Sequence, residues 1–340
     1  EAALAALPDL SRRGGGLGGR GRAIRICPES TATAELERAA KVGAQPLFTI
    51  EPGYPPLLAH VDAPPPLVYV KGDVGLLSRP TIAVVGSRDC SAAGQKLAGM
   101  LARDLGRAGF VVVSGLARGI DGAAHQAAIA TGTIAVLAGG IEIIYPPEHA
   151  ELHRRIGETG CLVTEQPPGF EPRGKDFPRR NRLISGLSHG VVIVEAAKRS
   201  GTFTTARMAG EQGREVFAVP GHPLDPRADG TNALLKDGAT LVTSAEDVLQ
   251  ALAHVVARPA FNEADPPATE FAAPLAPPPL LGDADRNLVV SALGPAPVDI
   301  DAIQRATGLP VRTVNILLME LDLAGRLERH GRQLVSLRLA

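Results

Sequence analysis

The sequence predicts an α/β protein whose core is a Rossmann-like, doubly wound, mostly parallel sheet. Between about residues 66 and 255, short β-branched runs alternate with Ala-rich stretches that are typical of helices. The apolar runs are continuous, which is typical of strands that are covered on both faces. Because crossovers between parallel strands are right-handed, the Ala-rich stretches are expected to form helices on both sides of the sheet.

The strands are expected where the apolar runs lie. Six runs qualify: Thr81–Val85, Phe110–Ser114, Thr133–Leu137, Cys161–Glu165, Gly190–Val194 and Glu215–Val219. A Gly-containing turn and a helix-like segment follow each run, except after the fourth, where a Pro-rich basic loop is expected. The Rossmann-like domain is therefore assigned to residues 66–255.

The flanking regions differ from this domain in composition. Residues 1–62 are Gly- and Arg-rich, then helical in pattern over Thr33–Val42, then turn-rich, and are predicted to be part of a small helical domain. Residues 256–282 are predicted to be a linker, because seven prolines and several alanines lie between residues 259 and 279.

The C-terminal residues 283–338 are predicted to form a winged-helix domain. Helices are expected over Asp285–Leu293, Ile300–Thr307 and Pro310–Ala324. A short β-hairpin is expected over Arg326–Leu337, with its turn near Gly331. Three helices followed by a hairpin favour a winged helix.

The bulk composition limits the possible functions. The 340-residue chain has a net charge of −1, so any nucleic-acid-binding face must be local. Its three cysteines are scattered, without a metal-binding spacing, and are expected to be reduced thiols. No apolar stretch approaches the roughly 20 residues that span a bilayer. A cytoplasmic protein without membrane contact is expected.

The most informative local feature is the segment from residue 173 to 182, which reads RGKDFPRRNR. It holds five basic residues, one acidic residue and one aromatic residue, Phe177. Basic side chains neutralise phosphates and an aromatic ring stacks on a base, as a groove for single-stranded nucleic acid requires. Taken alone, the segment fits a solvated basic loop equally well.

The first strand ends in a turn that is suited to phosphate. Gly86, Ser87 and Arg88 follow the strand, and a helix is expected to begin near Ser91. A helix N-terminus presents free N–H groups and the positive end of the helix dipole. Gly86 lets the backbone approach, and Arg88 can hold a phosphate through two hydrogen bonds. The alternative is an ordinary turn with a surface arginine.

Two further strand ends carry similar turns. Their glycine, hydroxyl and basic residues are Ser114, Gly115 and Arg118 after the second strand, and Lys198, Ser200, Gly201 and Thr202 after the fifth. Such residues at a helix start form anion-binding nests. Because strand ends at one edge of a parallel sheet converge, we expect these turns and the basic segment to share one edge.

Two nucleotide-binding patterns are rejected. Glycines at positions 14, 16 and 19 match GxGxxG, but no strand precedes them. The stretch from Gly169 to Lys175 fits GxxxxGK, but Asp176 replaces the Ser or Thr that would hold magnesium.

Two histidine patterns are interpreted as structural. His149 and His153 lack the glutamate of a zinc-protease helix and are interpreted as a solvated helix face. Asp121 and His125, four residues apart, are interpreted as a hydrogen-bonded pair rather than a metal site. No metal and no cofactor are therefore expected.

The ordered motifs together resemble the DprA/Smf family over about residues 66–250. They are Gly86-Ser87-Arg88, Ser114-Gly115-Leu116-Ala117-Arg118-Gly119-Ile120-Asp121, Phe177-Pro178-Arg179-Arg180-Asn181-Arg182-Leu183-Ile184, Ser200-Gly201-Thr202 and Pro220-Gly221. The linker and winged helix resemble those of the longer members. The N-terminal piece resembles the later part of the family's SAM-like domain, with its beginning absent.

The resemblance implies a DNA-processing protein of natural transformation. Such a protein binds and protects incoming single-stranded DNA, helps to load RecA onto it, and forms a homodimer through its Rossmann-like domain. The family requires no metal or nucleotide cofactor and is not enzymatic.

The resemblance also implies roles for individual residues. Arg88 binds phosphate in a central pocket, and Phe177 stacks on a base beside Lys175. Arg180 and Arg182 add positive charge, and Arg118 is added here from its charge and position. The full predicted DNA-binding set is Gly86, Ser87, Arg88, Ser114, Gly115, Arg118, Lys175, Phe177, Arg180, Asn181, Arg182, Lys198, Ser200, Gly201 and Thr202.

Two other functions are weighed against this one. A phosphoribohydrolase of the lysine decarboxylase-like type needs a catalytic glutamate, and Thr205 stands at the comparable position. A regulator that binds duplex DNA through the winged helix needs basic residues on its recognition helix, and only Arg312 and Asn315 lie early in the candidate helix. Both are therefore less favoured.

Overall fold

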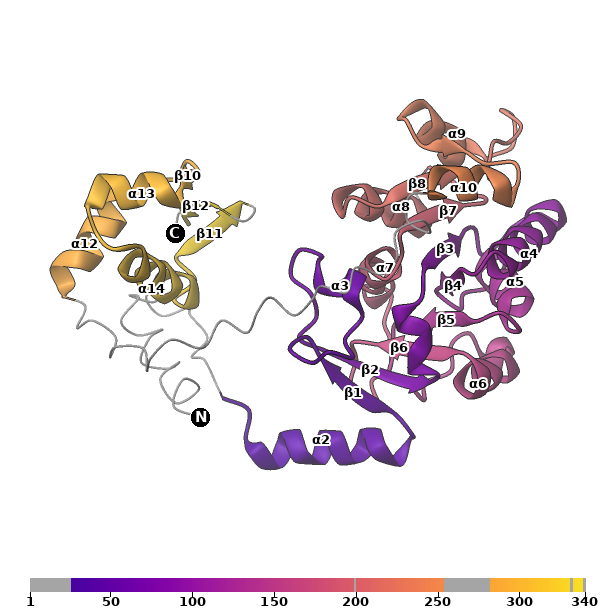
Figure 1. The fold of residues 1–340 in the computed structure, drawn as a ribbon, viewed down its shortest axis with the longest axis horizontal. Helices are drawn as coiled ribbons and strands as arrows, with labels where there is room; N and C mark the ends of the chain where they lie inside the picture. Colours follow the sequence, from indigo (N-terminus) through magenta and orange to yellow (C-terminus); the bar gives the residue numbers. More distant parts are fainter. Residues whose placement is uncertain (1–25, 199, 254–281, 331–332, 339–340) are drawn as a thin grey trace. The chain divides into compact units, whose positions relative to one another are not determined.

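The fold was analysed in a computed structural model that describes residues 26–198, 200–253, 282–330 and 333–338 (Figure 1). The chain divides into two compact units, Ser30–Asn262 and Glu263–Ala340 together with Glu1–Glu29. The predicted linker at 256–282, apart from Gly282, and the glycine pattern at residues 14–19 lie outside the described residues.

The larger unit contains a nine-stranded sheet with the strand order β1-β2-β6-β5-β4-β3-β7-β8-β9. The expected strands are β3 (Thr81–Val85), β4 (Val111–Ser114), β5 (Thr133–Val136), β6 (Cys161–Thr164), β7 (Gly190–Ile193) and β8 (Glu215–Ala218). All six lie within a residue of their predicted ends and are parallel to their neighbours in this group. The prediction of a mostly parallel, doubly wound sheet is confirmed.

The chain reverses its direction across the sheet at β3. From β3 the strands β4, β5 and β6 follow one another on one side, and then β7, β8 and β9 (Thr240–Leu241) continue on the other. The crevice between the ends of β3 and β7 is therefore the topological switch point. In open α/β sheets, ligands bind at this place.

The N-terminal edge of the sheet differs from the prediction. Strand β1 (Gln45–Phe48) pairs antiparallel with β2 (Leu67–Gly72), which in turn pairs antiparallel with β6. Helix α2 (Glu29–Lys41) buries Ala39 in the same apolar cluster as Tyr69 of β2. The described part of the expected helical piece at 1–62 thus contributes a helix and an edge strand to the sheet unit.

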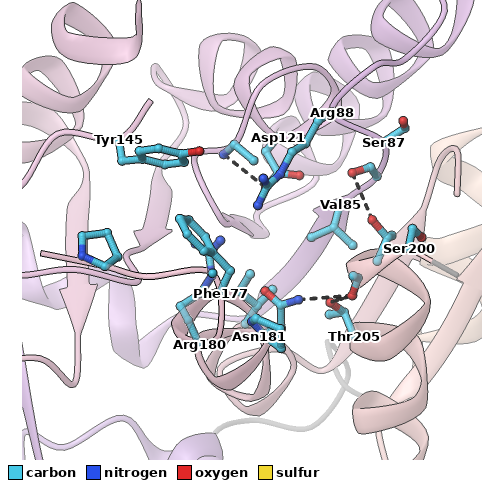
Figure 2. Close-up of a pocket in the computed structure, with 18 residues that line it drawn as sticks. Val85, Ser87, Arg88, Asp121, Tyr145, Phe177, Arg180, Asn181, Ser200 and Thr205 are labelled. Atoms are coloured by element: carbon cyan, nitrogen blue, oxygen red, sulfur yellow. Dashed lines mark hydrogen bonds between the residues drawn. The ribbon is translucent and has the colours of Figure 1, made fainter. Parts of the chain in front are cut away.

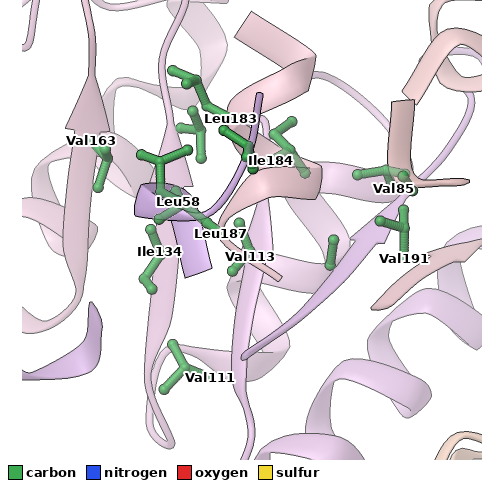
Figure 3. Packing of buried hydrophobic residues seen from close by; sticks show 14 of the residues in the cluster. Leu58, Val85, Val111, Val113, Ile134, Val163, Leu183, Ile184, Leu187 and Val191 are labelled. Atoms are coloured by element: carbon green, nitrogen blue, oxygen red, sulfur yellow. The ribbon is translucent and has the colours of Figure 1, made fainter. Parts of the chain in front are cut away.

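The two faces of the sheet are covered by different helices, because successive strand residues point to opposite sides. Ile82 and Val84 of β3 pack with α4 (Ala92–Arg107), α5 (Ile120–Ala128) and α10 (Ala245–Ala251). Ala83 and Val85 pack with α7 (Asp176–Gly186) and α8 (Gly201–Glu211), as Figure 3 shows for part of this cluster. The remaining helices of this unit are α3 (Pro56–Ala59), α6 (Ala150–Thr159) and α9 (Asp229–Lys236), with 3₁₀ turns at Val74–Ser78 and Pro147–His149.

The smaller unit is a winged helix, as predicted. Its elements are α12 (Asp283–Ala292), β10 (Val298–Asp299), α13 (Ile300–Thr307), α14 (Val311–Leu323), β11 (Leu327–His330) and β12 (Leu334–Leu337). The three strands form one sheet in the order β10-β12-β11 over an apolar core that includes Val314 and Leu317. Strand β10 was not expected, and the turn at Gly331 lies outside the described residues.

Within the part of the chain that the structure describes, no helix has the length and apolar composition to cross a membrane.

Candidate nucleic-acid interface

A pocket of about 620 Å³ lies at the topological switch point of the sheet (Figure 2). Segments that follow β3, β4, β5, β6 and β7 contribute to its wall. The lining residues are Val85, Gly86, Ser87, Arg88, Ala117, Asp121, Tyr145, Pro172, Gly174, Phe177, Pro178, Arg180, Asn181, Ile184, Ser200, Gly201, Thr202 and Thr205. The sequence predicted nine of these residues as binding residues.

The cationic and aromatic part of the pocket is a cluster of three side chains. The Arg88 guanidinium carbon lies 5.1 Å from the centre of the Phe177 ring. The Tyr145 ring lies 5.0 Å from the Phe177 ring, tilted by 53°. Figure 2 shows these side chains, which come from three separate segments, facing one another across the pocket. Arg88 is exposed and forms no ion pair with any described carboxylate, so its charge is available to a ligand.

The start of α8 forms a second wall of the pocket. The Ser200 side chain caps the helix by accepting a hydrogen bond from the Phe203 N–H (3.3 Å). The Thr202 hydroxyl donates to the Gly86 carbonyl (3.1 Å), which ties the helix to the turn after β3. The Asn181 amide donates to the Gly201 carbonyl (3.2 Å). The positive end of the α8 dipole therefore faces the same space as Arg88.

The start of α4, which was expected to bind phosphate through its N–H groups, is already occupied. The Glu195 carboxylate accepts hydrogen bonds from the Ser91 N–H (2.9 Å) and the Ser91 hydroxyl (2.5 Å). The Ser91 hydroxyl in turn accepts from the Gly94 N–H (2.9 Å). Groups of the protein itself therefore accept the Ser91 and Gly94 N–H hydrogen bonds at this helix start, which leaves fewer N–H groups there for an external phosphate than the sequence suggested.

Most of the basic segment is helical rather than a loop, because only residues 173–175 precede the helix. Helix α7 begins at Asp176, whose carboxylate accepts a hydrogen bond from the Arg173 N–H (2.8 Å). Pro178 lies in the first turn, where the missing N–H costs no helical hydrogen bond. The helical period then distributes the basic side chains over different faces, so that they do not form one continuous strip.

Arg180 belongs to the protein interior. It is 5% exposed and donates to the Gly115 carbonyl (2.6 Å) and to the Val136 carbonyl. Burial lowers the pKa of Arg180 to about 10, so it remains a cation at neutral pH. Arg180 was expected to add positive charge to the site, and it lines the pocket from a buried position, where its guanidinium holds the ends of two strands together.

Asp121 is the acidic partner of Arg180 in the interior. Its carboxylate accepts hydrogen bonds from the N–H groups of Gly115 (3.1 Å) and Ala117 (3.4 Å). Burial raises the pKa of Asp121, while the Arg180 charge opposes that shift. A Cβ atom at Gly115 would lie 2.7 Å from the Arg180 guanidinium, so glycine is needed there for this approach.

Two of the predicted binding residues do not line the pocket and instead stabilise the fold beside it. Gly115 makes room for Arg180, and the buried Ser114 hydroxyl donates to the Val84 carbonyl (2.7 Å).

Four other predicted cations also lie outside the pocket lining. Arg118 forms an ion pair with Glu148, and both are well exposed. Arg182 is paired with Glu165, which also contacts Arg179 at 3.0 Å. Lys175 and Lys198 are exposed. Among the described residues, Arg88 is therefore the one exposed cation in the pocket lining.

Sequence reasoning missed Tyr145 as a site residue. It follows β5 in the stretch Tyr145-Pro146-Pro147. The signal was an aromatic residue close to the end of the third predicted strand, at the edge where the other turns converge.

The histidine interpretations are partly corrected. His153 is buried, and its ring lies 3.0 Å from the Ile141 carbonyl, so it is not on a solvated face. His149 lies before α6, and its ring contacts the Leu116 carbonyl (3.0 Å). His125 is bonded to the Thr133 hydroxyl (2.7 Å) and not to Asp121. No group of three potential metal ligands occurs among the described residues.

Comparison with known proteins identifies relatives of both units. A model of the family described as DNA recombination-mediator protein A matches residues 45–253, and a model of the DprA winged helix domain matches residues 271–331. Protein Smf of Escherichia coli is 42% identical over 280 residues, which cover 80% of this chain and 72% of that protein. The DNA processing protein DprA of Bacillus subtilis is 46% identical over 202 residues, or 58% and 68% of the two chains.

Two solved structures resemble the described fold. DNA processing protein A from Streptococcus pneumoniae superposes with a TM-score of 0.62 at 39% identity, over 66% of this chain and 78% of that one. The protein from Helicobacter pylori, described for its unique mode of binding single-stranded DNA, has a TM-score of 0.57 at 30% identity, over 62% and 96% of the two chains.

Proposed function

This chain belongs to the DprA/Smf family of DNA recombination-mediator proteins, and from that membership we propose that it binds single-stranded DNA during natural transformation and recombination. The observation that carries the proposal is the unpaired Arg88 beside the Phe177 ring at the switch point of the sheet. A single strand can place a phosphate on the free cation and stack an unpaired base on the neighbouring ring. A base-paired duplex cannot use the ring in this way, because its bases are stacked inside the helix.

The pocket recognises the backbone and the base faces of the strand. Arg88 and the N-terminus of α8 face a phosphate. The rings of Phe177 and Tyr145 stack on bases, and any of the four bases can stack in this way because each has an aromatic face. Binding is therefore expected to show little sequence preference and a strong dependence on salt.

The further roles rest on family membership. We propose that the protein protects incoming DNA, helps to load RecA onto it, and forms a homodimer through its Rossmann-like domain. We also propose that it acts in the cytoplasm and catalyses no reaction. The division of labour would follow the units, with DNA held by the sheet unit and the winged helix in an accessory role.

The enzymatic alternative lacks its acid–base group. Thr205, at the position of the hydrolase glutamate, is buried and donates its hydroxyl to the Gly201 carbonyl (3.2 Å). The pocket's own carboxylate, Asp121, is engaged by backbone N–H groups and lies beside Arg180.

The duplex-binding alternative lacks a basic recognition helix. The face of α14 around Val311, Ile316 and Met319 is largely apolar, which suits a protein contact better than a DNA groove.

The test is fluorescence anisotropy with a labelled oligo-dT strand and a labelled duplex of the same length. Tighter binding of the single strand, with affinity falling steeply between about 50 and 200 mM salt, is expected. Equal or tighter binding of the duplex would indicate that the protein binds DNA through the winged helix instead. Release of free base from nucleoside monophosphates would instead support the hydrolase.

A further inference from the structure

A second groove, which we call the α4/α5 groove, lies on the outer surface of the sheet unit. Helices α4 and α5 lie side by side on one face of the sheet (Figure 1). The groove between them is lined by nine residues, including Gln95, Lys96, Gly99, Arg103 and Gln126. Gly99 leaves space at the bottom of the groove, because a Cβ atom at this position would lie 3.8 Å from the Ala127 side chain and fill the gap between the helices.

The groove is positively charged without compensation. Lys96 and Arg103 are exposed, and neither forms an ion pair in the described part of the chain. The nearest acidic neighbour in sequence, Asp104, is paired with Arg107 instead (3.7 Å). No aspartate or glutamate lines the groove, although the chain carries 36 of them against 35 lysines and arginines. An acid-free surface in a chain of this composition favours an anionic ligand.

The groove begins beside the DNA pocket. Arg88, which lines the pocket, precedes the α4 cap Ser91 by three residues. The two turns that start α4 and α5 touch, because a Cβ atom at Gly119 would lie 2.4 Å from the Ser87 carbonyl oxygen. Lys96 lies about 7 Å along α4 from Ser91, and Arg103 about 10 Å further, at 1.5 Å of rise per residue. The two cations therefore mark a track that leads away from the pocket.

We propose that the α4/α5 groove is a second binding site for the sugar–phosphate backbone of the strand that leaves the pocket. The inference rests on the proposed single-strand binding and extends it to a longer site. Lys96 and Arg103 would each neutralise one phosphate, while the amides of Gln95 and Gln126 donate neutral hydrogen bonds. The site holds few groups that could read a base, so it adds affinity and length rather than sequence preference.

The experiment compares two oligonucleotide lengths. Anisotropy is measured with oligo-dT of about five nucleotides, which fills the pocket alone, and of about twenty, which reaches the groove. The variant is Lys96→Gln/Arg103→Gln, which keeps both helix propensity and surface polarity. The control is Arg155→Gln/Lys236→Gln, which removes the same charge from exposed positions on α6 and α9.

The expected result is specific to the long strand. Loss of two phosphate contacts lowers the salt slope by about 1.4, at ~0.7 per contact on single strands. Between about 50 and 200 mM salt, the wild-type protein should therefore lose about sevenfold more affinity for the long strand than the variant does. The short strand should bind the variant and the wild type equally, and the control should match the wild type on both.

Three outcomes would overturn the proposal. The long strand could bind the variant and the control alike, in which case the groove makes no phosphate contact. The variant could change the oligomeric state in sedimentation without a change in slope, which would make the groove an interface between copies of the chain. If wild-type protein binds neither length, the proposed function itself fails, and that result is distinct from the other two.

Discussion

The Arg88→Ala variant tests whether the exposed arginine of the pocket, rather than another arginine near the site, binds phosphate. Arg88 is exposed, it contacts the Phe177 ring, and no described carboxylate is paired with it. The substitution therefore leaves no buried charge behind and should lower the free energy of unfolding by no more than about 1 kcal/mol, through loss of the contact with the Phe177 ring. Its main effect should appear in DNA binding.

The magnitude follows from the single contact that is lost. A hydrogen bond to a charged group contributes about 1.5–3 kcal/mol, which corresponds to roughly a 10- to 150-fold weaker Kd for oligo-dT. One phosphate contact fewer lowers the salt slope by about 0.7, or about threefold between ~50 and ~200 mM salt. Anisotropy titrations of wild type and variant at both salt concentrations measure the two effects together.

The matched control is Arg118→Ala. Arg118 is also an exposed arginine near the same edge, but it is paired with Glu148 and does not line the pocket. We expect its loss to leave oligo-dT binding close to that of the wild type, because Glu148 already neutralises its charge and it does not line the pocket. If Arg118→Ala weakens binding as much as Arg88→Ala does, or if Arg88→Ala leaves the salt slope unchanged, the assignment of Arg88 as the phosphate ligand is wrong.

Three further predictions follow from the same geometry. Phe177→Ala should weaken oligo-dT binding by about 1–3 kcal/mol through lost stacking, with a salt slope equal to that of the wild type; a slope that falls as well would show that the ring acts by holding Arg88 in place. Arg180→Met should destabilise the protein by about 3–5 kcal/mol in urea denaturation, because it leaves the buried Asp121 carboxylate without its counter-charge, and retention of wild-type stability would contradict the interior role of Arg180. Burial lowers the pKa of His125 from 6.5 to about 3, so the His125 ring is neutral in the folded protein between these pH values. The unfolded chain therefore binds one proton more between these values, and stability should fall by up to about 1.4 kcal/mol per unit as the pH drops below ~6.5; a wild-type slope no steeper than that of His125→Gln would contradict this.

The parallel part of the fold could be predicted because its strands are continuous apolar runs separated by turn residues. The edge strands β1 and β9 escaped prediction for a physical reason. Strand β9 has only two residues, and β1 lies in a Pro-rich stretch that reads as turns. Their pairing depends on contacts with β2 and β8, which are remote in the chain, rather than on local pattern.

The positions of the candidate site residues could be predicted where the backbone sets the geometry, but not where side chains compete for the same hydrogen-bonding groups. Gly86, Arg88 and Thr202 lie at strand and helix ends, so topology alone brings them together. The sequence could not show that Glu195 occupies the start of α4, because an internal carboxylate and an external phosphate satisfy the same N–H groups. Nor could it show that Arg180 points inward, since one position along a helix turns a side chain by about 100°.

The antiparallel edge of the sheet affects the order in which the strands can pair while the chain is being synthesised. Strands β1 and β2 leave the ribosome first, yet β2 can pair with β6 only after β3, β4 and β5 have been made. Until then Val68 and Val70, which end fully buried, have no partner surface on that side. The sheet can therefore grow from β3 as the chain emerges, whereas closure of its N-terminal edge is a long-range step that comes late.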